Sequence, residues 1–101
     1  MGWKEEVMTR KIFKYRVNDE QIVEMPVSAR IIHCDLQGDK VTLWAEVPVD
    51  VEHHEMDIFE CKIVGTGWEI DVEKFKHINT VITNNLGLVW HIYIEGKACV
   101  K

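Results

Sequence analysis

The stretch Ala29–Val47, ARIIHCDLQGDKVTLWAEV, contains two strand-like runs joined by a tight turn. Glycine beside aspartate at Gly38-Asp39, between runs rich in β-branched residues, is typical of a short antiparallel hairpin. In the second run every other residue is apolar, which is the period of a half-buried strand. The shared face carries Val41, Leu43, Ala45 and Val47. This stretch therefore predicts a β-hairpin with one face in a core.

The same period of two continues on both sides of the hairpin. Lys11–Val17 alternates, with Phe13 and Tyr15 on one face and Lys14 and Arg16 on the other. Further strands are predicted at 21–25, 57–64, 68–70, 77–83 and 88–95, and one helical turn at most at 71–75, capped by Asp71. Because the strands are short and the turns frequent, we expect an all-β fold, either a small antiparallel β-sandwich or a partly open barrel of six to eight short strands.

The length of 101 residues fits one domain. We expect residues 1–9 to form a loose N-terminal extension, residues 10–95 a single β domain, and residues 96–101 a frayed tail. No stretch approaches the roughly 20 apolar residues that a membrane-spanning helix needs, so no membrane role is expected. The three cysteines, an odd number without framework spacing, favour free thiols and a cytoplasmic location.

The sequence contains no pattern that supports catalysis, a cofactor or a metal. His33 and Cys34 are adjacent, and on a strand adjacent side chains point to opposite faces. His53, His54 and Cys61 lack the paired spacing of a zinc site. The only serine, Ser28, has no glycine elbow, and Gly65-Thr66-Gly67 has Ile70 where a dinucleotide fingerprint needs a third glycine. We therefore expect a protein that is not an enzyme and uses no metal or cofactor.

Two residues within strands leave alternatives open. His91 is either a ligand or pH-sensitive group, or a hydrogen-bonded residue on the less buried face of its strand. Trp44 shares the polar face of its strand with Thr42 and Glu46, so it is either an interface anchor or part of a two-sided core. Nucleic acid is not an expected ligand, because alternation separates Phe13 and Tyr15 from the neighbouring basic residues.

The acidic loop (Pro48–Glu60), with Trp44 beside it, is the predicted partner-binding surface. The net charge is −5, and no lysine or arginine lies between Lys40 and Lys62. The six carboxylates between Lys40 and Lys62, which have no local cation in the sequence, repel one another, and a protein partner with a basic surface would relieve that repulsion. They are Glu46, Asp50, Glu52, Glu55, Asp57 and Glu60. The predicted site residues are Trp44, Glu46, Asp50, Glu52, His53, His54, Glu55 and Asp57. We also expect a homodimer formed through an exposed strand, since a small sheet has edges to protect.

Several segments together resemble a known family. They are Gln21–Pro26, Ala29–His33, Val41–Val47, Lys62–Gly67, Ile78–Val81 and Leu88–Ile92, with Gly65-Thr66-Gly67 and Val89-Trp90-His91 as the most specific parts. Across residues 10–94 the chain is similar to a family of short proteins of unknown function found in bacteriophages and prophage regions. The resemblance implies an accessory protein in the bacterial cytoplasm, and it carries over no catalytic residues.

The function expected from these observations is non-enzymatic binding of a host or viral macromolecule, with inhibition of a bacterial defence system as one such role. The alternatives are a structural or decoration protein of the virion and an oligomeric binder of a small ligand such as a nucleotide.

Overall fold

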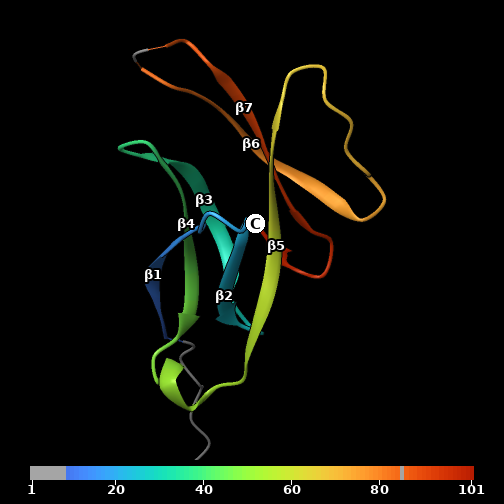
Figure 1. Cartoon of the computed structure of the whole chain (residues 1–101). Coiled ribbons are helices and arrows are strands. Elements are labelled where there is room, and N and C mark those ends of the chain that lie inside the picture. The colour runs from blue at the N-terminus through green and yellow to red at the C-terminus, as the bar shows by residue number, and fades with distance from the viewer. Residues whose placement is uncertain (1–8, 85) are drawn as a thin grey trace, which may run out of the picture.

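The computed structural model describes residues 9–84 and 86–101, which form two four-stranded sheets packed face to face (Figure 1). The strands are β1 (Arg10–Arg16), β2 (Ile22–Pro26), β3 (Arg30–Gln37), β4 (Lys40–Pro48), β5 (Met56–Gly65), β6 (Phe75–Ile82), β7 (Val89–Glu95) and β8 (Cys99–Val100). One 3-10 helix, η1 (Val51–His53), lies between β4 and β5. The prediction of an all-β, sandwich-like fold is confirmed.

The first sheet has the order β1-β4-β3-β8 and the second the order β2-β5-β7-β6. Neighbouring strands are antiparallel except for β3 and β8, which are parallel. The long strand β5 is shared: its first half pairs with β2 and its second half with β7. Only β3–β4 and β6–β7 are simple hairpins, so most pairings join segments that are far apart in the chain.

The hairpin between β3 and β4 has the two-residue loop that the sequence predicts. Gln37 pairs with Lys40, which leaves Gly38 and Asp39 as the loop. Gly38 has a φ of 67°, a value that glycine adopts without the steric cost of a Cβ. A positive φ at the first loop residue is the pattern of a type II′ turn, whose twist matches that of the flanking strands.

The core lies between the sheets and follows from the period-two pattern. Leu43, Ala45 and Val47 of β4 are fully buried, and they belong to one core cluster with Ile92 and Ile94 of β7, which are equally buried. Burial of one such leucine or isoleucine side chain stabilises the fold by about 1.5–3 kcal/mol. The two sheets are also joined by a hydrogen bond, in which the Asn79 side-chain amide of β6 donates to the Cys34 carbonyl of β3 at 2.6 Å.

Two predicted elements between β5 and β6 are absent. The strand predicted at 68–70 is wrong because the Trp68 amide donates to the Gly65 carbonyl at 3.1 Å and turns the chain away from the sheet. Residues 72–74 form a turn instead of a helix. The predicted cap is nevertheless present, since the Asp71 carboxylate accepts hydrogen bonds from the amides of Glu73 at 2.9 Å and Lys74 at 3.3 Å.

The C-terminal segment is not frayed as expected. Cys99 and Val100 pair with Arg30 and Ile31 of β3, and Ala98 is buried. The loose extension predicted for residues 1–9 lies, except for Thr9, outside the described residues. Among the described residues no helix is long and apolar enough to cross a membrane.

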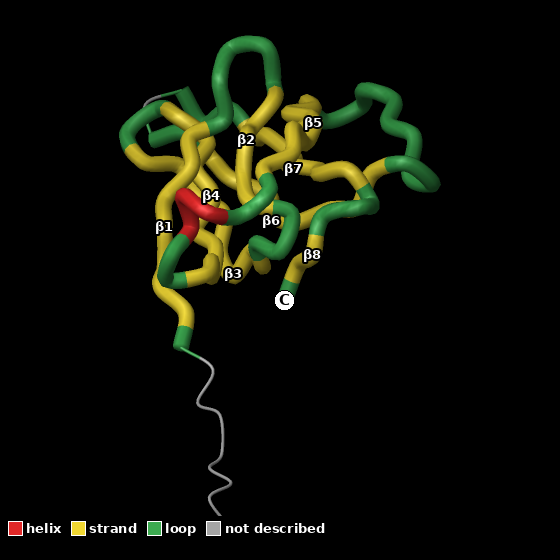
Figure 2. Tube along the Cα trace, turned by 90° about the horizontal axis from the view of Figure 1, so that it is seen from below, coloured by secondary structure: helices red, strands yellow, loops and turns green. Residues whose placement is uncertain are grey.

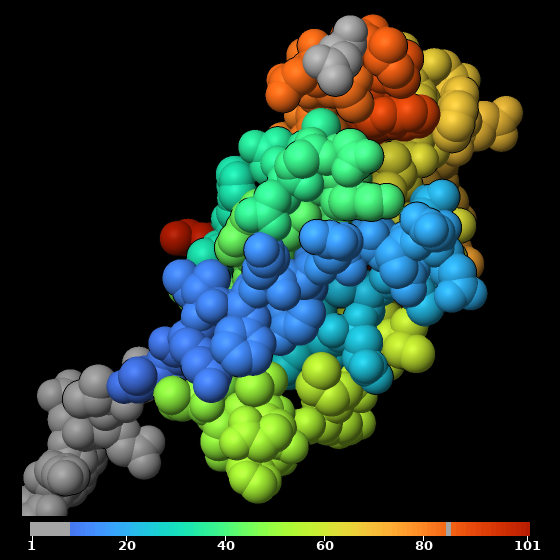
Figure 3. Space-filling view, turned by 60° about the vertical axis from the view of Figure 1, so that its left-hand side comes forward, coloured from blue at the N-terminus to red at the C-terminus, as the bar shows by residue number. Residues whose placement is uncertain are grey.

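The two ends of the sandwich carry different surfaces. The strand β4 starts at the β3–β4 hairpin and ends beside the acidic loop, so these features lie at opposite ends (Figure 1). Figure 2 looks onto the loop end, where η1 is drawn in red near β1 and β4. In Figure 3 the β3–β4 hairpin lies next to the tip of the β6–β7 hairpin, far from the acidic loop. The end that carries the β3–β4 hairpin and the tip of the β6–β7 hairpin is called the cleft end below.

Candidate functional site

Five of the six carboxylates between Lys40 and Lys62 lie beside a lysine, arginine or histidine side chain. The ion pairs and carboxylate–imidazole pairs are Glu46 with Arg30 at 3.9 Å, Asp50 with His54 at 3.1 Å, Glu52 with His53 at 3.9 Å, Asp57 with Lys97 at 3.1 Å and Glu60 with Lys62 at 3.2 Å. Within residues 9–84 and 86–101, Glu55 alone of the six carboxylates has no such pair. The expectation that these carboxylates lack a local cation is therefore wrong for Glu46, Asp57 and Glu60, although the role of the six carboxylates in partner binding stays a prediction.

Asp57 is the best anchored of these carboxylates. It accepts a hydrogen bond from the Ile58 amide at 2.8 Å and one from the Lys97 ammonium at 3.1 Å. These two hydrogen bonds, the backbone one first, lower the pKa of Asp57 below its usual value. The Lys97 ammonium also lies 5.1 Å from the centre of the Phe59 ring, so the pair is tied to the edge of the core.

Trp44 lies outside the core cluster and four residues along β4 from Pro48, where the acidic loop starts. It is half-buried on the outer face of the first sheet, opposite Lys14 on β1 and against the His33 ring, with 5.4 Å between ring centres. Four residues along an extended strand, about 13 Å, separate Trp44 from Pro48. The predicted site residues therefore form two groups, one on a sheet face and one in the loop.

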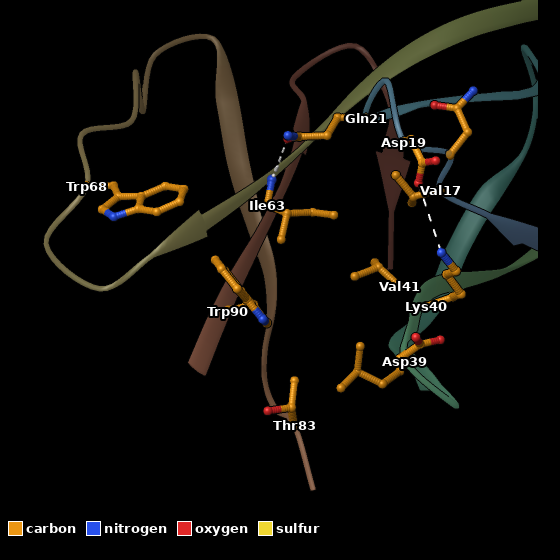
Figure 4. A pocket seen from close by; sticks show the side chains of 12 residues that line it. Val17, Asp19, Gln21, Asp39, Lys40, Val41, Ile63, Trp68, Thr83 and Trp90 are labelled. Carbon is orange, nitrogen blue, oxygen red and sulfur yellow. Dashed lines mark hydrogen bonds and ion pairs between the residues drawn. The ribbon is translucent and has the colours of Figure 1, made fainter. Parts of the chain in front are cut away.

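A cleft of about 340 Å³ opens at the cleft end, between the two sheets (Figure 4). Its apolar floor comes from both sheets, with Val41 of β4 facing Ile63 of β5 and Trp90 of β7. Its rim is polar. The residues that line it are Val17, Asn18, Asp19, Gln21, Leu36, Asp39, Lys40, Val41, Ile63, Trp68, Thr83 and Trp90. A cavity of this size with an apolar floor and a few polar groups is typical of binding sites.

Two tryptophans form one wall of this cleft. Trp68 and Trp90 meet edge to face, with ring centres 5.8 Å apart. The Trp68 ring covers Gly65, where an added Cβ would lie only 3.0 Å from the Trp68 Cε2 atom. Gly65 pairs with Trp90 in the sheet, so the missing side chain leaves the space that Trp68 fills. Trp68 nevertheless stays 61% exposed, which leaves much of the indole available to another molecule.

The rim opposite the tryptophans is acidic. Asp19 and Asp39 line the cleft together with Lys40, whose ammonium lies 4.0 Å from the Asp19 carboxylate. Asp39 has no ion pair in the described part of the chain. The cleft therefore combines an aromatic wall with one carboxylate that no internal cation neutralises.

Exposed apolar side chains extend the cleft toward the β6–β7 hairpin. A second hollow of about 560 Å³ shares Asp39 and Thr83 with the cleft and reaches Leu86. Around this hairpin Ile82 is 62%, Leu86 75% and Leu88 45% exposed. Exposed apolar groups gathered beside a polar rim are a common mark of an interaction surface.

The outer face of the second sheet carries a chain of hydroxyl and imidazole groups. Thr66 Oγ1 lies 2.8 Å from His91 Nε2, His91 Nδ1 lies 3.0 Å from Thr80 Oγ1, and that hydroxyl lies 2.9 Å from His77 Nε2. The hydrogen-bonded interpretation of His91 is therefore confirmed. A threonine stands where a hydrolytic triad has a carboxylate, so the arrangement lacks the charge that stabilises an imidazolium.

The cysteines and histidines do not assemble into a reactive or metal-binding group. Burial raises the pKa of Cys34 to about 12, with a further contribution from Asp35, and burial likewise raises the pKa of Cys61 to about 12. Neither thiol is a nucleophile near neutral pH, because the thiolate is the reactive form. Among the described residues there is no group of three or more metal-ligating side chains.

The sequence reasoning missed the cleft. Its residues come from five separate segments, and Trp68 was assigned to a strand. One signal was available: the two motifs singled out as most specific, Gly65-Thr66-Gly67 and Val89-Trp90-His91, are the segments that interlock here through the Gly65–Trp90 pair and the Thr66–His91 hydrogen bond.

Comparison with known proteins gives one match. A family model described as a domain of unknown function (DUF7352) matches residues 8–99. No curated protein and no solved structure matches the chain.

Proposed function

For this chain, which belongs to the DUF7352 family of domains of unknown function, we propose a non-enzymatic role in binding a macromolecular partner through the cleft end. The observation that carries the proposal is the cleft with its two tryptophans, continuous with the exposed apolar hairpin around Leu86. Tryptophan is enriched among residues that dominate binding energy at interfaces. The open shape of the cleft suits a side chain presented by another protein.

The biological setting that we propose is that of a phage or prophage accessory protein in the bacterial cytoplasm, with interference with a host defence system as one form of the role. Support comes from the similarity of residues 10–94 to short phage and prophage proteins. A gene position in an early accessory block supports this setting, whereas a position among head and tail genes supports the virion alternative.

The small-ligand alternative draws on the same tryptophans, since aromatic rings stack on nucleobases. The uncompensated Asp39 carboxylate argues against it, because phosphate groups would be repelled at the rim. A purified protein that carries an absorbance peak at 260 nm would favour the nucleotide binder.

Self-association remains part of the proposal. The edge strands β1, β2 and β6 offer unpaired backbone groups, which a second copy can cover across a two-fold axis. A strictly monomeric mass at high concentration and low salt would exclude the homodimer without affecting the cleft.

Site-specific photocrosslinking in bacterial cells tests the proposed binding function. A photoreactive residue at Leu86, which is 75% exposed at the cleft end, should give a discrete crosslinked product. The matched control is Val49, an apolar residue that is 52% exposed at the loop end. A product from Val49 alone would move the binding surface to the acidic loop, and no product from either position would contradict a binding role.

A further inference from the structure

We propose that the cleft end binds an arginine side chain on the surface of a partner protein. The inference rests on the proposed binding function and specifies the chemistry that the cleft selects. It combines the tryptophan wall, the carboxylate on the opposite rim and the absence of an internal cation at the rings.

The tryptophan faces are the first element of this recognition. Cations are attracted to the faces of aromatic rings, and tryptophan is the strongest of the three aromatic side chains in this respect. Three lysines of the chain already lie over aromatic rings, but in each case the ring belongs to a phenylalanine. In the described residues no lysine or arginine occupies Trp68 or Trp90, so these rings are open to a cation from outside.

The charge on the rim is the second element. Lys40 forms an ion pair with Asp19 at 4.0 Å, whereas Asp39, in the same cleft, forms no ion pair among the described residues. Figure 4 shows Asp39 on the opposite side of the cleft from Trp68 and Trp90, so its charge would attract a cation over the indoles across the cleft and not through a hydrogen bond. An anionic occupant would be repelled by Asp39.

The shape of the occupant favours arginine over lysine. The guanidinium group is planar, so it can stack flat on the face of an indole, which the tetrahedral ammonium group of lysine cannot do. It is also less strongly hydrated than an ammonium group, which lowers the cost of entering an apolar cleft. The exposed apolar residues of the β6–β7 hairpin would contact the surface around the inserted arginine.

Tryptophan fluorescence of the full chain tests this inference with defined probes. The probes are three short peptides in which glycine alternates with arginine, with lysine or with glutamate. We expect the arginine peptide to change the emission saturably at low salt and to bind more tightly than the lysine peptide. The glutamate peptide should leave the emission unchanged.

Two matched charge changes locate the site. Asp39→Asn should weaken binding of the arginine peptide by about threefold to fivefold at low salt, because it removes the negative charge that attracts the guanidinium across the cleft. Glu52→Gln makes the same change at the loop end and should leave binding within about twofold. Trp68→Leu should remove most of the fluorescence response. Asp39 lies in an exposed turn, so its variant remains informative if Trp68→Leu fails to fold.

Several results would overturn the inference. These are the absence of saturable binding, equal binding of the lysine or glutamate peptide, and an Asp39→Asn variant that binds as tightly as the parent. If Glu52→Gln weakened binding of the arginine peptide and Asp39→Asn did not, the peptide would bind at the acidic loop and not in the cleft. A crosslinked product at Leu86 together with a failed peptide titration would retain the binding function and reject arginine as the recognised group.

Discussion

Both ends of this sandwich carry acidic residues, but the two ends differ in whether those residues form ion pairs within the chain. At the loop end most carboxylates have partners, and Lys97 reaches Asp57 from a distant part of the chain. At the cleft end Asp39 forms no ion pair among the described residues and lies across an open cleft from two tryptophans. A cluster of like charges therefore does not by itself mark a binding site. A carboxylate that lies beside apolar surface without an ion pair is the better indication of a binding site.

The largest expected effect concerns the core that both ends share. Ile92→Ala removes a fully buried side chain between the sheets and should lower the free energy of unfolding by about 2–5 kcal/mol. Urea unfolding followed by tryptophan fluorescence and by labelling of the buried thiols of Cys34 and Cys61 should give one coincident transition. Ile58→Ala, at a position 51% exposed, is the matched control and should cost far less. Separate transitions would mean that the two ends unfold independently.

A smaller effect is expected from the contact that builds the tryptophan wall. Gly65→Ala places a Cβ 3.0 Å from the Trp68 ring and should destabilise the fold by about 1–3 kcal/mol while shifting tryptophan emission to longer wavelength. In a Trp68→Ala background the same substitution should be nearly neutral, because the clash is gone. If Gly65→Ala lowers the free energy of unfolding by the same amount in both backgrounds, the destabilisation arises in the β5 backbone and not from the contact with Trp68.

Neutralising two exposed carboxylates of the acidic loop should have almost no effect on stability. The double variant Glu52→Gln, Glu55→Gln should change the free energy of unfolding by no more than about 0.5 kcal/mol, since both side chains are exposed. Chemical denaturation at low and high salt provides the measurement. A clear gain in stability at low salt would restore the original view that these carboxylates repel one another.

The smallest effect is a pH dependence at Asp57. Its pKa is lower in the folded protein than in the unfolded chain, so its contribution is present at neutral pH. The contribution is lost as the pH falls below about 4 and the carboxylate becomes protonated. The difference in urea midpoint between the parent and Asp57→Asn should therefore be present at pH 7 and shrink toward pH 3. A difference that persists unchanged at pH 3 would show that the ion pair is not its source.

The sequence predicts local features of this molecule better than its site. Period-two alternation places seven of the strands because burial on one face is a property of neighbouring residues. The strand β8 was not predicted because two residues are too few to show a periodic pattern. Its pairing with β3 also depends on a segment that lies far away in the sequence. The contacts of Lys97 with Asp57 and of Trp68 with Trp90 were not predicted for the same reason, because each joins residues that are far apart in the sequence. The Trp68 indole anchors in the space above Gly65, which no single segment reveals.

The parallel pairing of β8 with β3 also affects the chain while it is being made. A ribosome releases β3 and β4 early, but the partner that covers the outer edge of β3 follows only at Cys99 and Val100. At ordinary rates of synthesis the intervening 49–98 segment takes roughly 3–10 s to appear. During that time the nascent hairpin exposes a row of unpaired amides and carbonyls, which invites pairing with strands of other chains. Yield in cells should therefore respond to translation speed and chaperone supply more strongly than the stability of the finished fold implies.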